Sequence, residues 1–193
     1  MKKIILTLAV FLISFNISCS QDNEVIKIIK NRKSVRHFTG ESVSKEDLKK
    51  ILESAMCAPS AVNKQPWAFV VVTDRKILDA LADSLPYAKM LYKSGAAIII
   101  CAIPEKAHSE KTEFAIIDCS LAGENILLTV ESLGLGALWT AAYPYEERMN
   151  TVRNVLGIPQ NIIPLNVIPI GHPTGEDKPK DKFKEENIHW EKW

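Results

Sequence analysis

Three cations and one hydroxyl group lie within five residues of each other in the segment Arg32-Lys33-Ser34-Val35-Arg36. An arginine side chain presents a fork of donors that matches the oxygens of a phosphate, and a serine hydroxyl adds one more donor. The segment therefore has the side chains needed to hold a small phosphate-bearing ligand. On spacing alone, a solvated basic turn is the simpler alternative.

A second polar segment, residues 59–67, carries the hydroxyl and amide side chains of Ser60, Asn63 and Gln65. It leads directly into residues 67–73, whose β-branched and aromatic side chains predict a strand. Polar loops at the mouth of an apolar strand often supply donors that orient a ligand. A plain turn, in which Asn63 bonds its own backbone, accounts for the same residues equally well.

The composition is typical of one globular domain with a sizeable core, with 47% apolar and 24% charged residues in a chain of 193. The formal net charge is only +1, so the composition gives no electrostatic support for binding a nucleic acid. The basic cluster at residues 30–36 is local, which suits a small anionic ligand better than a polymer.

Residues 1–23 predict an export signal that precedes a single domain at residues 24–193. A basic start is followed by an apolar stretch at residues 4–17, which is too short to span a bilayer comfortably. The stretch ends just before Cys19, in a pattern that resembles a lipoprotein signal, although Asn16 stands where an aliphatic residue is usual. We expect lipidation of Cys19 to be the only link to a membrane; a plain cleaved signal, or a cytoplasmic protein with a misread signal, is the alternative.

Three further cysteines, Cys57, Cys101 and Cys119, belong to the predicted domain. No two cysteines have the close spacing of a metal-ligand pair, and we expect no metal site. We expect these three thiols to be inert packing residues rather than nucleophiles. His108 lies in a polar connection, where a solvated histidine is more common than a catalytic one.

Hydrophobic periodicity and cap residues predict alternating helices and strands. Helices are expected at residues 25–29, 44–57, 74–84, 112–133 and 146–156. Strands are expected at residues 67–73, 96–103, 137–141 and 162–170, the last interrupted by two prolines. Residues 87–93 fit either a short helix or a loop. Helices dominate, which favours an α+β or α/β sandwich.

The longest predicted helix, residues 112–133, is apolar around much of its surface and should be central. One face is predicted to carry Phe114, Ile117, Leu121, Asn125, Leu128 and Ser132. Polar residues interrupt the pattern at Asp118, Glu124 and Asn125. An exposed stripe is the simpler interpretation, and partial burial with pairing at an interface is the alternative. The charged C-terminal tail ends in aromatic residues, which is consistent with docking on another surface such as a second subunit.

Four motifs together resemble the FMN-dependent nitroreductase family in order and spacing. They are Arg32-x-Ser34-x-Arg36, Ala58-Pro59-Ser60-x-x-Asn63-x-Gln65-Pro66-Trp67, Gly134-Leu135-Gly136-x-x-Trp139, and Gly171-x-Pro173 with a basic tail. The resemblance covers about residues 25–193, and the first two motifs together are specific. It implies an α+β fold, an α/β/α sandwich around a mostly antiparallel sheet, and a homodimer with FMN bound at the subunit interface.

The resemblance also implies a set of cofactor-binding residues and no catalytic side chain. The phosphate and ribityl end of FMN would be held by Arg32, Lys33, Ser34, Arg36, Lys180 and Lys182. The isoalloxazine ring would be approached by Pro59, Ser60 and Asn63, from the other chain, and by Leu138, Trp139, Thr140 and Gly171. The departures are Lys182, where arginine is common, and Cys57, where a small residue is usual.

The implied reaction is the NAD(P)H-dependent reduction of nitroaromatics, quinones or similar small aromatic acceptors, by ping-pong hydride transfer through the flavin. The sequence shows no nucleophile–base pair, and a flavin enzyme needs none because the cofactor carries the hydride chemistry. Export conflicts with the use of NAD(P)H, because nicotinamide cofactors are scarce outside the cytoplasm. For an exported enzyme, another electron donor is the alternative. Two further alternatives are a lipid-anchored flavin-binding module without turnover and a dehalogenating or flavin-degrading relative.

Overall fold

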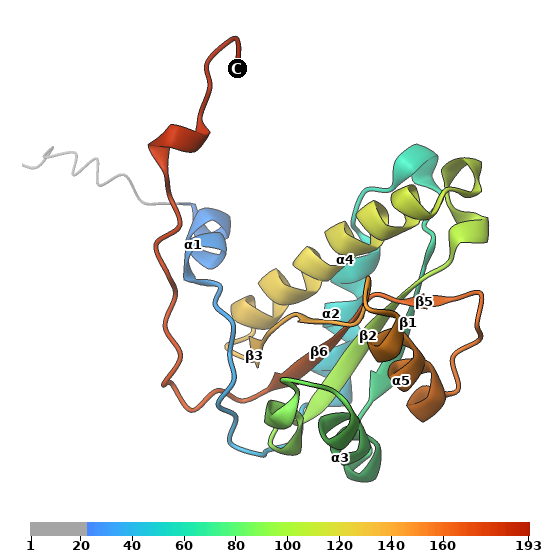
Figure 1. Ribbon diagram of the computed structural model, residues 1–193. Helices are drawn as coiled ribbons and strands as arrows, with labels where there is room; N and C mark the ends of the chain where they lie inside the picture. Colours follow the sequence, from blue (N-terminus) through green and yellow to red (C-terminus); the bar gives the residue numbers. More distant parts are fainter. Residues whose placement is uncertain (1–22) are drawn as a thin grey trace, which may run out of the picture.

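A six-stranded sheet forms the centre of the protein, whose computed structural model describes residues 23–193 (Figure 1). The strands are β1 (Trp67–Val72), β2 (Ala96–Ala102), β3 (Gly136–Ala137), β4 (Thr140–Ala141), β5 (Ile163–Pro164) and β6 (Asn166–Gly171). The main order is β1-β2-β6-β3, with β4 on β6 and β5 on β2, and every one of these pairs is antiparallel. The prediction of a mostly antiparallel sheet is confirmed.

The helices begin and end close to the predicted boundaries. They are α1 (Glu24–Asn31), α2 (Lys45–Met56), α3 (Arg75–Ser84), α4 (Thr112–Ser132) and α5 (Glu146–Leu156). Short 3₁₀ helices are η1 (Ala61–Asn63), η2 (Lys89–Tyr92), η3 (Pro104–Lys106), η4 (His108–Glu110) and η5 (Glu185–Asn187). The side chains of Ser44 and Asp74 accept backbone N–H groups at the starts of α2 and α3, which explains why both helices begin there.

Helices cover both faces of the sheet, so the predicted α/β/α sandwich is confirmed (Figure 1). On one face, α2 and α4 pack against the sheet through side chains such as Ile51 and Ile126, which are fully buried. On the other face, α3 and α5 contribute Leu81 and Val152 to a second apolar cluster. Strand β2 is buried along its whole length because both faces are covered.

The outward face of α4 differs from the prediction. Small residues such as Ala115, Cys119 and Ala122 face the core, which allows the helix to lie close to the sheet. The larger Ile117 and Leu121, predicted on one face of a central helix, are 55% and 41% exposed in the single chain. Helical periodicity places apolar residues on a common face, but it does not say which surface covers that face.

The polar residues of α4 also depart from the expected exposed stripe. Glu124 is exposed as predicted, whereas Asp118 is buried and Asn125 is half-buried, donating to the carbonyl of Ser54 at 3.0 Å. His108 is half-buried as well and packs edge-on against the ring of Phe114, so it is not freely solvated as expected. These polar groups contact residues from other elements of the fold, and helical periodicity in the sequence cannot predict such contacts.

Two predicted strands are broken. In place of one strand at residues 137–141, residues 136–141 form two separate two-residue strands, β3 and β4, with Leu138 and Trp139 between them. Residues 162–170 divide into β5 and β6, and Pro169 keeps its place in β6 opposite Ala97. None of the helices among residues 23–193 has both the length and the apolar character needed to cross a membrane. The predicted export signal and the lipidation site at Cys19 lie outside the described residues.

Candidate functional site

The segment from Arg32 to Arg36, which we call the basic loop, is fixed against the sheet edge. The backbone N–H of Val35 donates to the carbonyl of Ala137 at 2.9 Å, and Ser34 forms a parallel bridge with Ala137. The Val35 side chain is fully buried. It fits only because residue 136 is glycine: a Cβ there would lie 2.7 Å from Val35 Cγ1. The loop is therefore positioned by close packing against β3.

Two cations of the basic loop meet carboxylates on α4. Lys33 Nζ lies 3.0 Å from Glu131 Oε1, with both side chains largely buried, and Arg32 Nε lies 3.5 Å from Glu124 Oε1. Lys33 is thus committed to an ion pair, which the sequence did not suggest. The Arg36 side chain is exposed, and its guanidinium has no partner among residues 23–193.

The C-terminal segment brings further cations to the basic loop. A hollow of about 430 Å³ is lined by Arg32, Lys33, Ser34, Arg36, Glu176, Asp177, Lys178, Pro179, Lys180 and Lys182. Six cationic side chains thus face two carboxylates, an arrangement that favours an anionic group such as a phosphate. Three of the cations also line an adjoining hollow of about 550 Å³, which is walled by Ile29 and Phe183. The structure brings together every residue predicted for the phosphate end.

Asp177 is the better buried of the two carboxylates, with a side chain 15% exposed. Burial on its own raises the pKa of Asp177, but hydrogen bonds from the backbone N–H groups of Arg36 and His37 and from the His37 ring outweigh it. The net effect is a pKa lowered below the ordinary aspartate value. The carboxylate is therefore ionised at neutral pH.

The second predicted segment, residues 59–65, is tied down by α4 and by its own side chains. The backbone N–H of Ala61 donates to the Asp118 carboxylate at 3.1 Å, and the N–H of Gln65 donates to Ser60 Oγ at 3.0 Å. The Asn63 side chain accepts from the Gln65 amide at 3.0 Å instead of bonding its own backbone. The neighbouring Pro59 is exposed.

This second loop has an unusual backbone. Val62, Asn63 and Gln65 have φ values of 51°, 57° and 51°, in the left-handed region that residues with a side chain rarely adopt. A β-branched valine is especially disfavoured there, and the Val62 side chain is 72% exposed. Strained backbone that is held in place by surrounding contacts is common at functional sites. The loop therefore presents a fixed polar and apolar surface to solvent.

The remaining predicted residues lie deeper in the chain. Trp139 is half-buried and rests against Gly123, where a Cβ would come within 2.4 Å of the indole. Leu138 and Gly171 are buried, and a Cβ on Gly171 would lie 3.0 Å from the Phe38 ring. Leu138 and Gly171 line neither hollow at the basic loop, so the single chain does not present them to a ligand there. The hydroxyl of Thr140 is enclosed, with no partner among the described residues.

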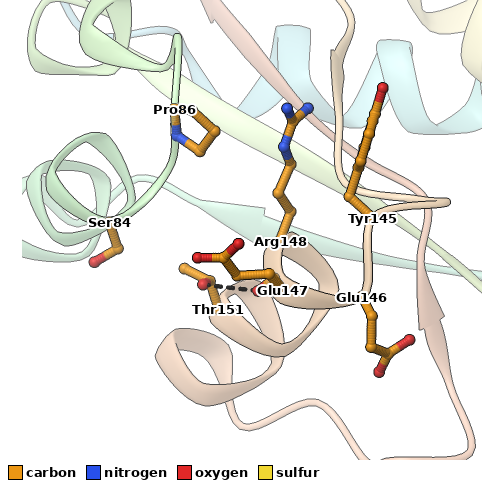
Figure 2. Close-up of a pocket in the computed structure, with 7 residues that line it drawn as sticks. All are labelled: Ser84, Pro86, Tyr145, Glu146, Glu147, Arg148 and Thr151. Atoms are coloured by element: carbon orange, nitrogen blue, oxygen red, sulfur yellow. Dashed lines mark hydrogen bonds between the residues drawn. The ribbon is translucent and has the colours of Figure 1, made fainter.

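A third hollow, of about 450 Å³, lies at the start of α5 on the other helical layer (Figure 2). Its lining residues are Ser84, Pro86, Tyr145, Glu146, Glu147, Arg148 and Thr151. The Arg148 guanidinium stacks on the Tyr145 ring at 3.9 Å and donates to the carbonyl of Ala141 at 3.4 Å. Arg148 thereby supports the backbone that immediately follows Thr140.

The two buried thiols are chemically quiet. Burial raises the pKa of Cys101 to about 12, and burial, with a smaller contribution from Asp118, raises the pKa of Cys119 to about 12. A thiol that stays protonated is a poor nucleophile. Cys57 is exposed at the end of α2, so the expectation that it is a packing residue is wrong. The physical reason is that Ala55 is the last buried residue of α2, and Cys57 follows the end of the helix off its buried face.

The basic loop and residues 59–65 lie at opposite ends of α4 in the single chain (Figure 1). Asp118, which holds the second loop, and Glu131, which holds Lys33, are thirteen positions apart. At 1.5 Å per residue this corresponds to about 20 Å along the helix axis. The predicted phosphate site and the predicted ring contacts from Ser60 and Asn63 are therefore separate surfaces of one protomer.

Comparison with known sequences defines the class of protein. A profile of the Nitroreductase family matches residues 29–89 and 82–172. Together these matches cover most of the chain, including the basic loop, residues 59–65 and the strands that support both. The chain therefore belongs to the Nitroreductase family.

Individual relatives agree with this assignment. A candidate NADH dehydrogenase/NAD(P)H nitroreductase of Archaeoglobus fulgidus is 43% identical over 173 residues, covering 88% of this chain and 99% of the relative. The crystal structure of a candidate with the same description from Parabacteroides distasonis has a TM-score of 0.84 and 43% identity, covering 89% of this chain and all of the other. A nitroreductase candidate of Desulfovibrio desulfuricans, solved in complex with FMN, has a TM-score of 0.76 and 27% identity, covering 89% and 99%.

Proposed function

We propose that this protein is an FMN-dependent oxidoreductase that oxidises NAD(P)H and reduces nitroaromatics, quinones or similar acceptors in two half-reactions. The observation that carries the proposal is the hollow at the basic loop, where six cationic side chains from two distant segments surround one space. In a chain of the Nitroreductase family, a relative of which was solved with FMN, this charge distribution fits the phosphate of that cofactor.

The residues of the hollow offer different kinds of donor to the phosphate. Arg36, whose guanidinium has no partner among the described residues, and Arg32 offer planar donor groups, while Lys180 and Lys182 add point charges from the tail. The exposed Ser34 hydroxyl adds a neutral donor. Bound FMN supplies the two-electron hydride chemistry, so the protein has to bind and orient the reactants rather than provide a nucleophile.

We further propose that the active site is completed by a second copy of the chain. The outer face of α4 exposes Ile117 and Leu121, and α1 beside it exposes Val25, Ile26 and Ile29. In a two-fold dimer built on this face with its axis perpendicular to α4, the N-terminal end of one α4 lies near the C-terminal end of the other. Residues 59–65 of one protomer would then reach the basic loop of its partner, which a single chain cannot achieve.

Absorbance of the purified full chain tests the cofactor and the donor together. We expect a flavin spectrum that bleaches on anaerobic addition of NADH or NADPH and recovers when a nitroaromatic or quinone is added. A flavin that never bleaches would point instead to another donor or to a binding role without turnover. Absence of flavin even after FMN is added would refute the proposal.

The shared site has a separate test, based on mixed dimers of Arg32→Ala and Asn63→Ala. If each site combines Arg32 of one chain with Asn63 of the other, a mixed dimer has one site with both changes and one intact site. The isolated mixed dimer should therefore have about half of the wild-type activity, and a random mixture about a quarter. If both residues serve a site within one chain, each site of the mixed dimer carries one defect and no recovery follows.

We also propose that Cys19 is lipidated and anchors the protein to a membrane after export, on the basis of the sequence pattern alone. Metabolic labelling with a fatty-acid probe should mark the wild-type chain and leave Cys19→Ser unlabelled. Equal labelling of both proteins would refute lipidation at this residue, and labelling of neither would favour a plain cleaved signal.

A further inference from the structure

The segment 172–177, which we call the hook, leaves β6 and pairs with the backbone that follows the basic loop. Thr39 N–H donates to the carbonyl of His172 at 3.0 Å, and Thr174 N–H donates to the carbonyl of His37 at 3.0 Å. An antiparallel bridge between Phe38 and Pro173 lies between these two bonds. The C-terminal chain is thus attached to the body alongside residues 37–39.

The hook closes on the side chain of Asp177. Gly175, with φ of +93°, reverses the chain direction, and Lys178 Nζ donates to the Gly175 carbonyl across the turn at 3.0 Å. Asp177 Oδ2 then accepts from Arg36 N–H at 2.9 Å, from His37 N–H at 3.1 Å and from His37 Nδ1 at 3.2 Å. One carboxylate oxygen therefore holds the backbone amide of the last residue of the basic loop and the amide that follows it.

Asp177 is the last residue of the tail with such an attachment. Among the described residues, the hydrogen bonds made by residues 178–193 reach only other residues of this tail or Gly175. Lys178, Lys180 and Lys182 are all exposed, yet all three line the hollow at the basic loop. Their position over the hollow therefore depends on the direction in which the chain leaves the hook.

The presence of Asp177 in this hollow has an electrostatic cost. A carboxylate that lines an anion site repels the ligand, and this one is ionised at neutral pH. Charge alone therefore gives no reason for an acid at this position. The hydrogen bonds that Asp177 accepts from the backbone N–H groups of Arg36 and His37 do explain an acid here, because they hold the tail where its lysines can act.

We propose that Asp177 is a positioning residue that latches the C-terminal tail to the basic loop, so that Lys180 and Lys182 close over the cofactor phosphate. This inference rests on the proposed FMN site and extends it: the phosphate-binding lysines are effective only while the latch is closed. Asp177 itself does not contact the phosphate in this scheme; it acts through the tail.

Two substitutions separate the latch from a simple charge effect. Asp177→Ala removes both the charge and the acceptor, whereas Asp177→Asn removes the charge but keeps an amide oxygen for the two N–H groups. Glu176→Ala is the matched control, since Glu176 lines the same hollow, accepts a hydrogen bond from Thr174 Oγ1 within the hook at 3.0 Å, and approaches the basic side of the hollow only at the His37 ring, at 3.8 Å. If Asp177 acted only through its charge, the alanine and asparagine variants would both bind FMN more tightly.

The first readout is the dissociation constant of FMN with the full-length protein, measured by quenching of flavin fluorescence. We expect Asp177→Ala to raise the Kd roughly tenfold, which corresponds to 1.4 kcal/mol. Asp177→Asn should stay within about threefold of wild type or bind more tightly, because hydrogen bonds are retained and an anion is lost. Tighter binding by both variants would overturn the latch.

The second readout does not depend on the cofactor. In the protein without FMN, trypsin should cleave after Lys180 and Lys182 several-fold faster in Asp177→Ala than in wild type, Asp177→Asn or Glu176→Ala. The thermal midpoints of the four proteins should agree, which separates release of the tail from general unfolding. Equal cleavage rates would overturn the latch, whereas a wild-type protein that binds no FMN would overturn the proposed function on the first readout.

Discussion

Gly136→Ala tests whether the close packing of Val35 positions the basic loop. A Cβ at residue 136 would lie 2.7 Å from Val35 Cγ1 and 2.8 Å from both Val35 Cβ and Cγ2. Carbon atoms in ordinary contact are 3.5–4.0 Å apart, so Val35 must move by about 1 Å. The atoms concerned lie next to the backbone, and rotation of the side chain cannot relieve all three contacts. The displacement therefore passes to Ser34 and Arg36.

The expected result is a joint loss of stability and cofactor affinity. Overpacking of a buried site costs about 1–3 kcal/mol, and we expect the free energy of unfolding in urea to fall by that amount. FMN titration should show a Kd raised roughly tenfold, since a shift of 1.4 kcal/mol in binding is tenfold. Both quantities are measured on the same preparation.

Gly134→Ala is the matched control in the same turn. Gly134 has φ of +71° and no atom within 4 Å of an added Cβ, so alanine there strains the backbone without touching Val35. The left-handed conformation costs about 1–2 kcal/mol, and we expect a comparable loss of stability with an unchanged FMN Kd. If Gly136→Ala loses the same stability yet binds FMN as tightly as Gly134→Ala, the position of Val35 does not govern the phosphate site.

Three further changes test other parts of the site. Glu131→Gln should tighten FMN binding by a few-fold in a fluorescence titration, because it releases Lys33 from its ion pair; weaker binding would show that the pair itself orders the loop. Asp118→Ala should lower turnover with excess FMN several-fold more than Asp118→Asn, because only asparagine keeps an acceptor for the Ala61 N–H; equal turnover would separate residues 59–65 from the reaction. In a chain carrying Cys19→Ser, a thiol reagent at pH 8 should modify Cys57 rapidly and the two buried thiols, whose pKa values are raised to about 12, only after unfolding. Rapid reaction of all three thiols in the native protein would contradict their burial.

Local signals in the sequence predicted the helices well because each signal acts within one turn. The Ser44 and Asp74 caps bond to amides two or three residues away, and Gly157 ends α5 with φ of +67°. Such contacts are read directly from neighbouring residue types. The prediction of one continuous strand at residues 137–141 was wrong for a related reason. Residue types that favour strands indicate an extended chain, but they do not show whether a partner strand continues beside it.

The arrangement of the candidate site could not be predicted in the same way, because it depends on contacts between residues that are far apart in the sequence. Lys33 and Glu131 are 98 residues apart, Ala61 and Asp118 are 57 apart, and Arg36 and Asp177 are 141 apart. The resemblance to a family supplied the cofactor-binding residues, but it did not supply the carboxylates that hold the two loops. A buried carboxylate at Asp118 looks like a break in an apolar helix until the amide that it accepts is known.

The positions of three carboxylates along helix α4 explain how the two loops are set at fixed places. Asp118 in its first half holds residues 59–65, while Glu124 near its middle and Glu131 near its end contact the basic loop. A straight helix of 21 residues fixes the distance between these contacts, and small side chains keep it close against the sheet. One rigid element therefore sets both loops in each protomer. In the proposed dimer, the same element, related by the two-fold axis, sets the loop of one chain against the phosphate site of the other.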